Sequence, residues 1–204
     1  NDQIMQRLLS QESGIDSRKI RDGRLAPDEL QSLLISMDNI GDTRLYLDDT
    51  PGITPAALRS KCQKLKRETD IDLVIIDYLQ LMTGDLFKDN RVQEVSYISR
   101  NLKILAKELN VPILTAAQMS RSVEQRADKL PMLSDLRESG SLEQDADIVM
   151  FLHKPDSDGT DDLEGLVKLI VAKHRNGPVG DIDLVYRKNL ARFDNAARVN
   201  DFGG

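Results

Sequence analysis

The run Leu73-Val74-Ile75-Ile76-Asp77 decides the fold, because four consecutive apolar residues end in a carboxylate. A strand that is apolar on both faces is typical of a parallel sheet covered by helices on both sides. Three further short runs are mostly apolar and are also predicted to be buried strands: residues 44–47, 111–117 and 148–152. Because these runs alternate with amphipathic segments, the sequence predicts an α/β domain whose mostly parallel sheet contains buried strands and is flanked by helices.

Four helices are predicted from apolar residues that recur three or four positions apart. They begin near Ile4, at Pro27, at Pro55 behind the capping residue Thr54, and at Val92. Prolines fit the first turn of a helix because that turn has no use for their missing N–H group. In the second helix, the residues expected to face the core are Leu30, Leu33, Leu34 and Met37.

After the last predicted helix-and-strand pair, the pattern changes to short strands and turns. Residues 167–172 and 182–186 are strand-like and are joined by Asn-Gly-Pro-Val-Gly, a sequence typical of a hairpin turn. We therefore expect a carboxy-terminal antiparallel hairpin extension of the sheet. Residues 83–90 and 119–144 follow neither period, and long irregular loops at strand ends are usually functional or mobile.

Composition limits the possible classes of protein. The 204 residues, 40% hydrophobic and 30% charged, suit a single domain with a sizeable core. No long apolar run or secretory signal is present, so we expect a cytoplasmic protein. Cys62 is the only cysteine, which excludes a disulfide framework and predicts a small core residue. The net charge of −6 argues against binding nucleic acid by bulk electrostatics.

Two of the predicted strands end in polar side chains that suit nucleotide chemistry. Asp77 can hold a magnesium-bound water at the carboxyl edge of the sheet, as the Walker B acid does in nucleotide-hydrolysing proteins. The alternative is an acid that merely caps the next loop. Gln118 ends the following strand, where an amide can sense a γ-phosphate or orient an attacking water. The alternative is a polar residue that closes a strand.

The loop after Gln118 is a candidate nucleic-acid contact. As far as Arg137, it carries one net positive charge, from Arg121, Arg126, Lys129 and Arg137 against Glu124, Asp128 and Asp135. Gly140 would let the main chain approach a phosphate closely. The chain has no tryptophan and few other aromatic residues, so such binding would follow the backbone rather than the base sequence. A solvated charged loop is the alternative.

A basic tip, Lys173-His174-Arg175, precedes the predicted hairpin turn. It can offer an arginine finger to a nucleotide on a neighbouring subunit, or it can be an ordinary basic surface hairpin. His153 and His174 have no partners at metal-ligand spacing. No G-x-x-x-x-G-K-[ST] sequence occurs, so the chain has no phosphate-binding loop of that kind.

Taken together, five stretches closely resemble the DnaB replicative helicases, and the resemblance covers nearly the whole chain. They are LDDTPG at residues 47–52, IDYLQL at 76–81, QMSRSVEQR at 118–126, SDLRESGSLEQDAD at 134–147 and KHRNGP at 173–178. The fourth stretch is the most specific. The resemblance implies a RecA-like P-loop NTPase core.

By this resemblance, Asp77 is the Walker B acid that serves Mg²⁺, and Gln118 is the phosphate-sensing amide. Lys173 and Arg175 are implied to reach the adjacent subunit's nucleotide. The family's contacts with single-stranded DNA fall on Arg137, Glu138 and Gly140, with Arg121 in the same loop region. Residues 83–90 would line the central channel.

The resemblance also implies a homohexameric ring that uses ATP and Mg²⁺ to move from 5′ to 3′ along one DNA strand at replication forks. Primase and a helicase loader are the implied partners. His174 stands where many relatives have glutamine, which leaves its neighbours Lys173 and Arg175 unchanged. The first residue aligns just after the strand that carries the family's catalytic glutamate, so the isolated chain is expected to lack ATPase activity.

Two other classes fit parts of the pattern. A RecA-fold recombinase or repair ATPase shares the strand-end acid and amide, but it forms helical filaments on DNA. A catalytically inert partner-binding domain would keep only the fold. Unwinding of a forked duplex by a closed hexamer favours the helicase.

Overall fold

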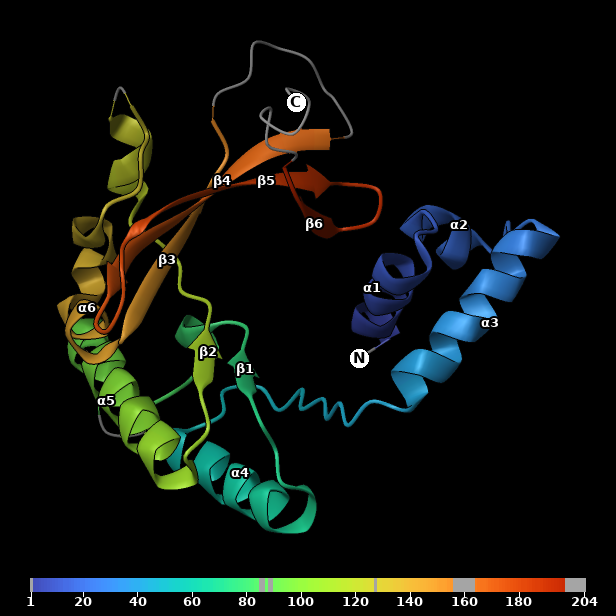
Figure 1. The fold of residues 1–204 in the computed structure, drawn as a ribbon. Helices are drawn as coiled ribbons and strands as arrows, with labels where there is room; N and C mark the ends of the chain where they lie inside the picture. The colour runs from blue at the N-terminus through green and yellow to red at the C-terminus, as the bar shows by residue number, and fades with distance from the viewer. Residues whose placement is uncertain (1, 85–86, 88–89, 127, 156–163, 197–204) are drawn as a thin grey trace. The chain divides into compact units, whose positions relative to one another are not determined.

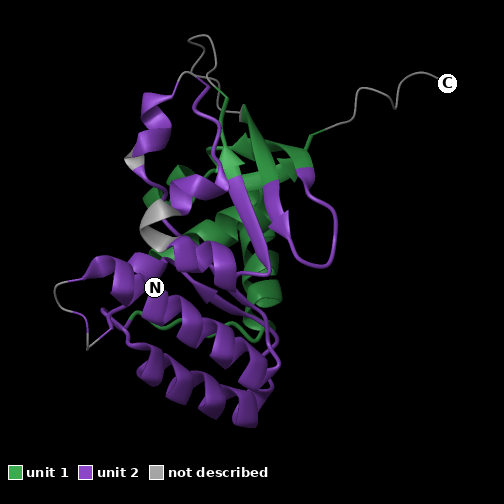
Figure 2. Cartoon of the chain, turned by 90° about the vertical axis from the view of Figure 1, so that its left-hand side faces the viewer, with its two compact units in different colours: residues 1–49, 152–170, 181–204 green, residues 50–151, 171–180 purple. Residues whose placement is uncertain are grey.

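A computed structural model describes residues 2–84, 87, 90–126, 128–155 and 164–196. The chain divides into two compact units, which Figure 2 colours separately. The first unit comprises Asn1–Asp49, Leu152–Ile170 and Asp181–Gly204. The second comprises Thr50–Phe151 and Val171–Gly180. All the predicted site residues belong to the second unit.

In its described residues, the first unit contains three helices: α1 (Asp2–Ser13), α2 (Ser17–Asp22) and α3 (Pro27–Gly41). Helix α1 packs against both of the others. Two hydrogen bonds tie α1 to the carboxy-terminal strands of the same unit: Gln11 Nε2 donates to the Ala191 carbonyl at 2.7 Å, and Arg192 Nη1 donates to the Gln11 carbonyl at 3.0 Å. Segments distant in sequence therefore form one unit.

The second unit is built around the long helix α5. Its helices are α4 (Pro55–Thr69), α5 (Arg91–Leu109) and α6 (Gly140–Asp145), with 3₁₀ turns η1 (Leu79–Leu81), η2 (Arg121–Gln125) and η3 (Leu133–Ser139). Figure 1 shows α4 and α5 beside the strands β1 and β2. One face of α5 is buried at the three- and four-residue spacing that the sequence predicts. It supplies residues to two apolar clusters, one with Leu79 and one with Cys62.

The strands of the described residues form two sheets. β1 (Val74–Ile76) and β2 (Ile113–Thr115) pair in parallel, with Ile76 opposite Thr115. The second sheet has the order β3-β4-β5-β6, with β3 (Ile148–His153), β4 (Glu164–His174), β5 (Gly180–Arg187) and β6 (Arg192–Asn195). β5 and β6 are antiparallel. β4 and β5 are neighbours in this sheet and are joined by residues 175–179, so the predicted carboxy-terminal hairpin is confirmed, and its strands are longer than expected.

The four predicted helices are confirmed, and so is the Thr54 cap, whose hydroxyl accepts a hydrogen bond from Ala57 N at 3.2 Å. The inward stripe expected in α3 is wrong for Leu30, Leu34 and Met37, which are about half exposed, because α3 packs mainly on α1. Only Leu33 of that stripe is buried.

Among the strands, the prediction for residues 44–47 is wrong, since they form no strand. An apolar run becomes a strand only where a neighbouring edge pairs with it. The strands were also expected to be buried, yet Ile75 of β1 is 65% exposed. Residues 119–144, predicted to be irregular, contain η2, η3 and the start of α6. Residues 85–86 and 88–89 of the other irregular segment lie outside the described part of the chain.

Candidate functional site

The carboxyl ends of β1 and β2 meet, and we call Asp77, Gln80 and Gln118 the strand-end region. The two segments remain paired beyond the strands. Ala116 N donates a hydrogen bond to the Ile76 carbonyl, and Leu79 N donates one to the Ala116 carbonyl, both at 2.9 Å. Asp77 directly follows β1 and is exposed. The expected proximity of the two strand ends, and hence of Asp77 and the segment leading to Gln118, is therefore present.

Gln80 joins these two strand ends through its side chain. Its Oε1 accepts a hydrogen bond from Gln118 N at 3.2 Å, and its Nε2 donates to the Gln118 carbonyl at 3.4 Å. The amide of Gln80 thereby fixes the main chain of Gln118 from both sides, while Gln118 itself is exposed. Sequence reasoning missed Gln80. The available signal was a single polar residue within the apolar stretch that follows Asp77.

Arg91 at the start of α5 supports the same turn. Its Nη2 donates to the Gln80 carbonyl at 2.7 Å, and its Nη1 pairs with Glu94 at 2.5 Å. Glu94 also accepts a hydrogen bond from Gly84 N at 2.8 Å. The Gly84 N–H, and then Arg91, hold the pKa of Glu94 below its ordinary value despite partial burial. These contacts fix the first residues of the 83–90 segment against α5.

The basic tip lies on the carboxyl end of α6, and we call Asp147, Lys173 and Arg175 the hairpin region. Lys173 Nζ donates to the Glu143 carbonyl, and Arg175 Nη2 donates to the Gln144 carbonyl at 2.7 Å. The last carbonyls of a helix have no partner within the helix and carry partial negative charge. The two cations therefore cap α6.

His174 is directed elsewhere, because side chains alternate along a strand. Its Nδ1 lies 3.2 Å from the Pro178 carbonyl, within the hairpin. A Cβ atom at Gly177 would clash with the His174 ring, so glycine is what allows this packing. The contacts of His174 are therefore separate from those that Lys173 and Arg175 make with the end of α6.

Asp147 joins the tip to α5. Its carboxylate accepts a hydrogen bond from Lys103 and lies 3.6 Å from Arg175 Nε, and its carbonyl accepts a hydrogen bond from Arg175 N at 2.9 Å. The Lys103 hydrogen bond holds the pKa of Asp147 below its ordinary value, with Arg175 adding to the effect. In the described part of the chain, no hydrogen bond or ion pair links Lys173 or Arg175 to Asp77 or Gln118.

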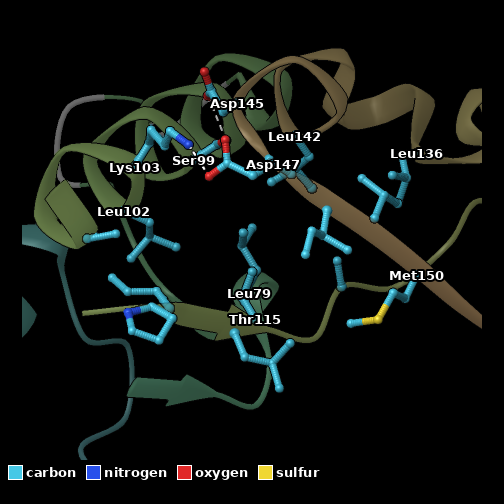
Figure 3. A pocket seen from close by; sticks show the side chains of 18 of the residues that line it. Leu79, Ser99, Leu102, Lys103, Thr115, Leu136, Leu142, Asp145, Asp147 and Met150 are labelled. Atoms are coloured by element: carbon cyan, nitrogen blue, oxygen red, sulfur yellow. Dashed lines mark hydrogen bonds and ion pairs between the residues drawn. The ribbon is translucent and has the colours of Figure 1, made fainter. Parts of the chain in front are cut away.

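A cavity of about 450 Å³ lies within the second unit (Figure 3). Its walls come mostly from apolar residues of α5, β2 and β3, together with residues near α6. Ser99 and Asp145, joined by a hydrogen bond of 2.7 Å, belong to its polar rim, as do Lys103 and Asp147. None of Asp77, Gln118, Lys173 and Arg175 lines it. The cavity is thus separate from the predicted site residues.

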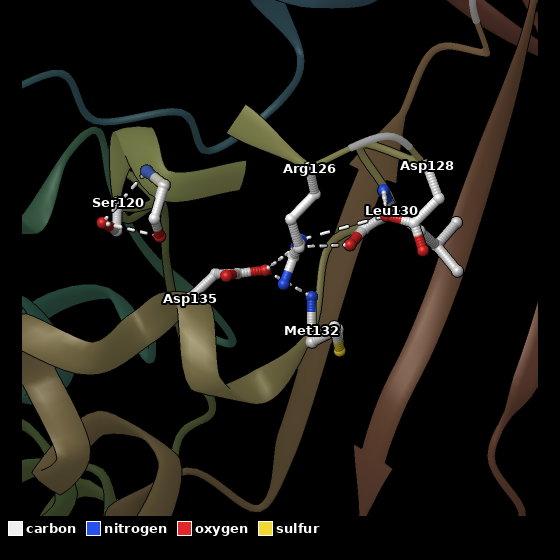
Figure 4. A network of polar contacts seen from close by, with 7 residues as sticks. Ser120, Arg126, Asp128, Leu130, Met132 and Asp135 are labelled. Atoms are coloured by element: carbon white, nitrogen blue, oxygen red, sulfur yellow. Dashed lines mark hydrogen bonds and ion pairs between the residues drawn. The ribbon is translucent and has the colours of Figure 1, made fainter. Parts of the chain in front are cut away.

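The loop after Gln118 is held by a partly buried ion pair between Arg126 and Asp135 (Figure 4). Asp135 is only 3% exposed and accepts hydrogen bonds from Arg126 Nη2 at 2.6 Å and Met132 N at 2.7 Å. Burial raises the pKa of Asp135, but these two donors outweigh it and leave the pKa below its ordinary value. Arg126, grouped by sequence with exposed basic residues, therefore has a structural partner inside the loop.

The predicted DNA-contacting residues lie in the short helices of this loop. Arg121 begins η2, and Arg137 and Glu138 belong to η3, but the side chains of all three lie outside the described part of the structure. Gly140 begins α6 with open space where a Cβ would lie. Its main chain is therefore accessible, as the prediction requires. The DNA-binding role of these residues stays a prediction.

Asp77 is the one predicted metal-binding residue. Among the residues whose positions are described, no three His, Cys, Asp or Glu side chains gather into a possible metal site. A single exposed carboxylate nevertheless suits Mg²⁺, which keeps several waters and takes its other ligands from phosphates.

In the described parts of the chain, no helix is both long and apolar enough to span a membrane.

The chain matches the family model of the DnaB-like helicase C-terminal domain over residues 1–195. It is 46% identical to the replicative DNA helicase DnaB of Geobacillus stearothermophilus, across 96% of this chain and 44% of that protein. It is 45% identical to the replicative DNA helicase DnaC of Bacillus subtilis (strain 168), across 100% of this chain and 45% of that protein. The chain thus spans less than half the length of these relatives.

Two solved structures are similar in fold. One is described as an ATPase domain, with a TM-score of 0.86 and 40% identity over 94% of this chain and 69% of that one. The other is a DnaB-like replicative helicase studied with its primase interactions, with a TM-score of 0.86 and 38% identity over 94% of this chain and 47% of that one. These likenesses confirm the predicted RecA-like α/β fold.

Proposed function

This chain belongs to the family of DnaB-like helicase C-terminal domains, and from this premise we propose that it is part of the motor of a replicative DNA helicase. The supporting observation is the strand-end region, in which Gln80, three residues after Asp77, hydrogen-bonds the main chain of Gln118. In open α/β sheets, ligands bind outside the carboxyl ends of the strands. The strand-end region has that position.

In this proposal, each strand end has one task at a bound ATP. Asp77 holds a water of the magnesium ion, which neutralises charge on the phosphates when it is bound. Gln118 presents its amide to the γ-phosphate from a main chain that Gln80 keeps in place. ATP hydrolysis also requires a phosphate-binding loop, and residues 1–204 contain no G-x-x-x-x-G-K-[ST] sequence.

Lys173 and Arg175 would serve the nucleotide of the adjacent subunit in a homohexamer. Arg175 is half exposed, so its guanidinium can meet an incoming phosphate, and its planar fork suits two phosphate oxygens. The residues around Arg121, Arg137, Glu138 and Gly140 would contact the backbone of single-stranded DNA. Movement from 5′ to 3′, and partnership with primase and a loader, complete the proposal, in which residues 1–204 form one carboxy-terminal domain.

The experiment is forked-duplex unwinding and ATP hydrolysis by the full-length protein. We expect unwinding by a hexamer, and a loss of DNA-stimulated ATPase activity of about a thousandfold in Arg175→Ala, as for other arginine fingers. Asp77→Asn removes the carboxylate and should abolish turnover. Residues 1–204 alone should show no magnesium-dependent ATPase activity.

Three outcomes would contradict parts of the proposal. Helical filaments on DNA with strand exchange, and no unwinding, would indicate a recombinase. A full-length protein that binds no ATP would indicate an inert partner-binding domain. Turnover above background by residues 1–204 alone would show that hydrolysis does not need a G-x-x-x-x-G-K-[ST] loop.

A further inference from the structure

Arg175 is held at two points by one residue, Asp147. The carbonyl of Asp147 accepts a hydrogen bond from the Arg175 main-chain N–H at 2.9 Å, and its carboxylate faces the Arg175 Nε at 3.6 Å. The main-chain contact fixes where the side chain begins, and the carboxylate fixes the direction in which it leaves. At the far end of the guanidinium, Nη2 donates a hydrogen bond to the Gln144 carbonyl at 2.7 Å.

Asp147 is itself anchored to the core of the second unit. Its carboxylate accepts a hydrogen bond from Lys103 of α5, a side chain only 24% exposed, whereas the Arg175 side chain is 50% exposed. Lys103 follows Leu102, which is buried in the main cluster of this unit. The chain of contacts therefore runs from a rigid helix, through Asp147, to the exposed end of Arg175.

From this geometry we infer that Asp147 is a positioning residue, which aims Arg175 at the nucleotide of the adjacent subunit. The inference rests on the proposed function of Arg175 and adds a residue to it. Positioning matters because a displacement of about 1 Å in a group that stabilises a transition state can cost roughly a hundredfold in rate. Asp147 does not touch the nucleotide, so its effect passes through Arg175.

Asp145 provides a matched control, because it lies two residues earlier and pairs with Ser99 rather than with Arg175. Both Asp145→Asn and Asp147→Asn remove one negative charge and preserve the side-chain shape. In the full-length protein, we expect Asp147→Asn to lower kcat for ATP about tenfold with little change in KM, because Arg175 acts in the transition state. Asp145→Asn should keep a kcat close to that of the parent protein. Asp147→Glu, which keeps the negative charge, should lose much less of kcat than Asp147→Asn.

A mixed ring separates positioning from simple damage. Asp77→Asn subunits have an inactive nucleotide site but keep Asp147 and Arg175. Asp147→Asn subunits keep Asp77 but offer their neighbour an Arg175 that has lost its partner carboxylate. If Asp147 acts across the interface, rings of the two variants should hydrolyse ATP faster than the average of the two pure proteins. Activity equal to that average would overturn the inference. If Asp147→Asn fails to assemble, Lys103→Met, which removes the anchor, carries the same test.

Arg175→Ala distinguishes the two levels of the proposal. If Arg175→Ala retains full ATPase activity, the proposed role of Arg175 fails, and the role of Asp147 fails with it. If Arg175→Ala is impaired while Asp147→Asn and Lys103→Met are normal, only the inference about Asp147 fails. In that case the contact is an exposed ion pair, of a kind that contributes little.

Discussion

The strand-end region and the hairpin region are held in different ways. Gln118 is fixed by the pairing of parallel strands and by the neutral amide of Gln80. Arg175 is fixed by a helix end and by the ionised carboxylate of Asp147. Hydrogen bonds between neutral groups respond little to pH or salt, whereas exposed ion pairs respond to both. The difference suits the sensing role proposed for Gln118 and the contact with a neighbouring subunit proposed for Arg175.

The largest expected effect comes from removing the apolar support of the strand-end region. Leu79 lies between Asp77 and Gln80 in the sequence, and its side chain is fully buried. Leu79→Ala should therefore lower the free energy of unfolding by about 2–5 kcal/mol. Leu81, two residues later in the same turn, is 55% exposed, and Leu81→Ala should cost much less. Denaturant titration of both variants measures the difference. Equal losses would show that this turn is not anchored by Leu79.

The next effect tests the amide bridge itself. Gln80→Ala removes both hydrogen bonds to the main chain of Gln118, which together should stabilise the turn by about 1–2 kcal/mol. Hydrogen exchange at the Gln118 amide should accelerate by about tenfold, since roughly 1.4 kcal/mol corresponds to a factor of ten. Gln63→Ala, on the exposed face of α4, is the control. Unchanged exchange at Gln118 would mean that strand pairing alone fixes it.

The smallest effect is a difference in response to acid. The pKa of Asp147 is lowered in the folded chain, chiefly by Lys103, so its contribution to stability is present above the ordinary value and lost as pH falls through the lowered pKa. We therefore expect acid to release Lys103 and Arg175 while the Gln80 bridge persists. Side-chain and amide NMR shifts of Arg175 and Gln118, followed from neutral pH to below about pH 4, measure this. Simultaneous changes at both residues would contradict the comparison.

Local patterns predicted the helices well. The apolar spacing of α5 and the Thr54 cap of α4 are decided by residues close in sequence, and both appear in the structure as expected. The apolar run at residues 44–47 was equally regular, yet it forms no strand, because a strand needs a partner that its own sequence does not contain. Helix α6 was not predicted for a different reason: its six residues are too few to show a helical periodicity.

Within the candidate site, the sequence singled out residues but not their supports. Asp77 and Gln118 were identified because each ends an apolar run, and parallel pairing brings the two ends together. Gln80 and Asp147 were missed as supports because their roles depend on atoms far away in the chain. Arg126 was grouped with exposed basic residues, although the buried carboxylate of Asp135 holds it.

The sequence by itself determined the α/β class, the approximate starts of the main helices and the family, because these follow from short-range periodicity and from long matching motifs. Only the tertiary structure decided that Gln80 bridges the strand ends and that Asp147 links Arg175 to Lys103. Hydrogen bonds and ion pairs act over a few ångströms in space, whatever the separation in sequence. Folding brings together groups whose pairing no local pattern records.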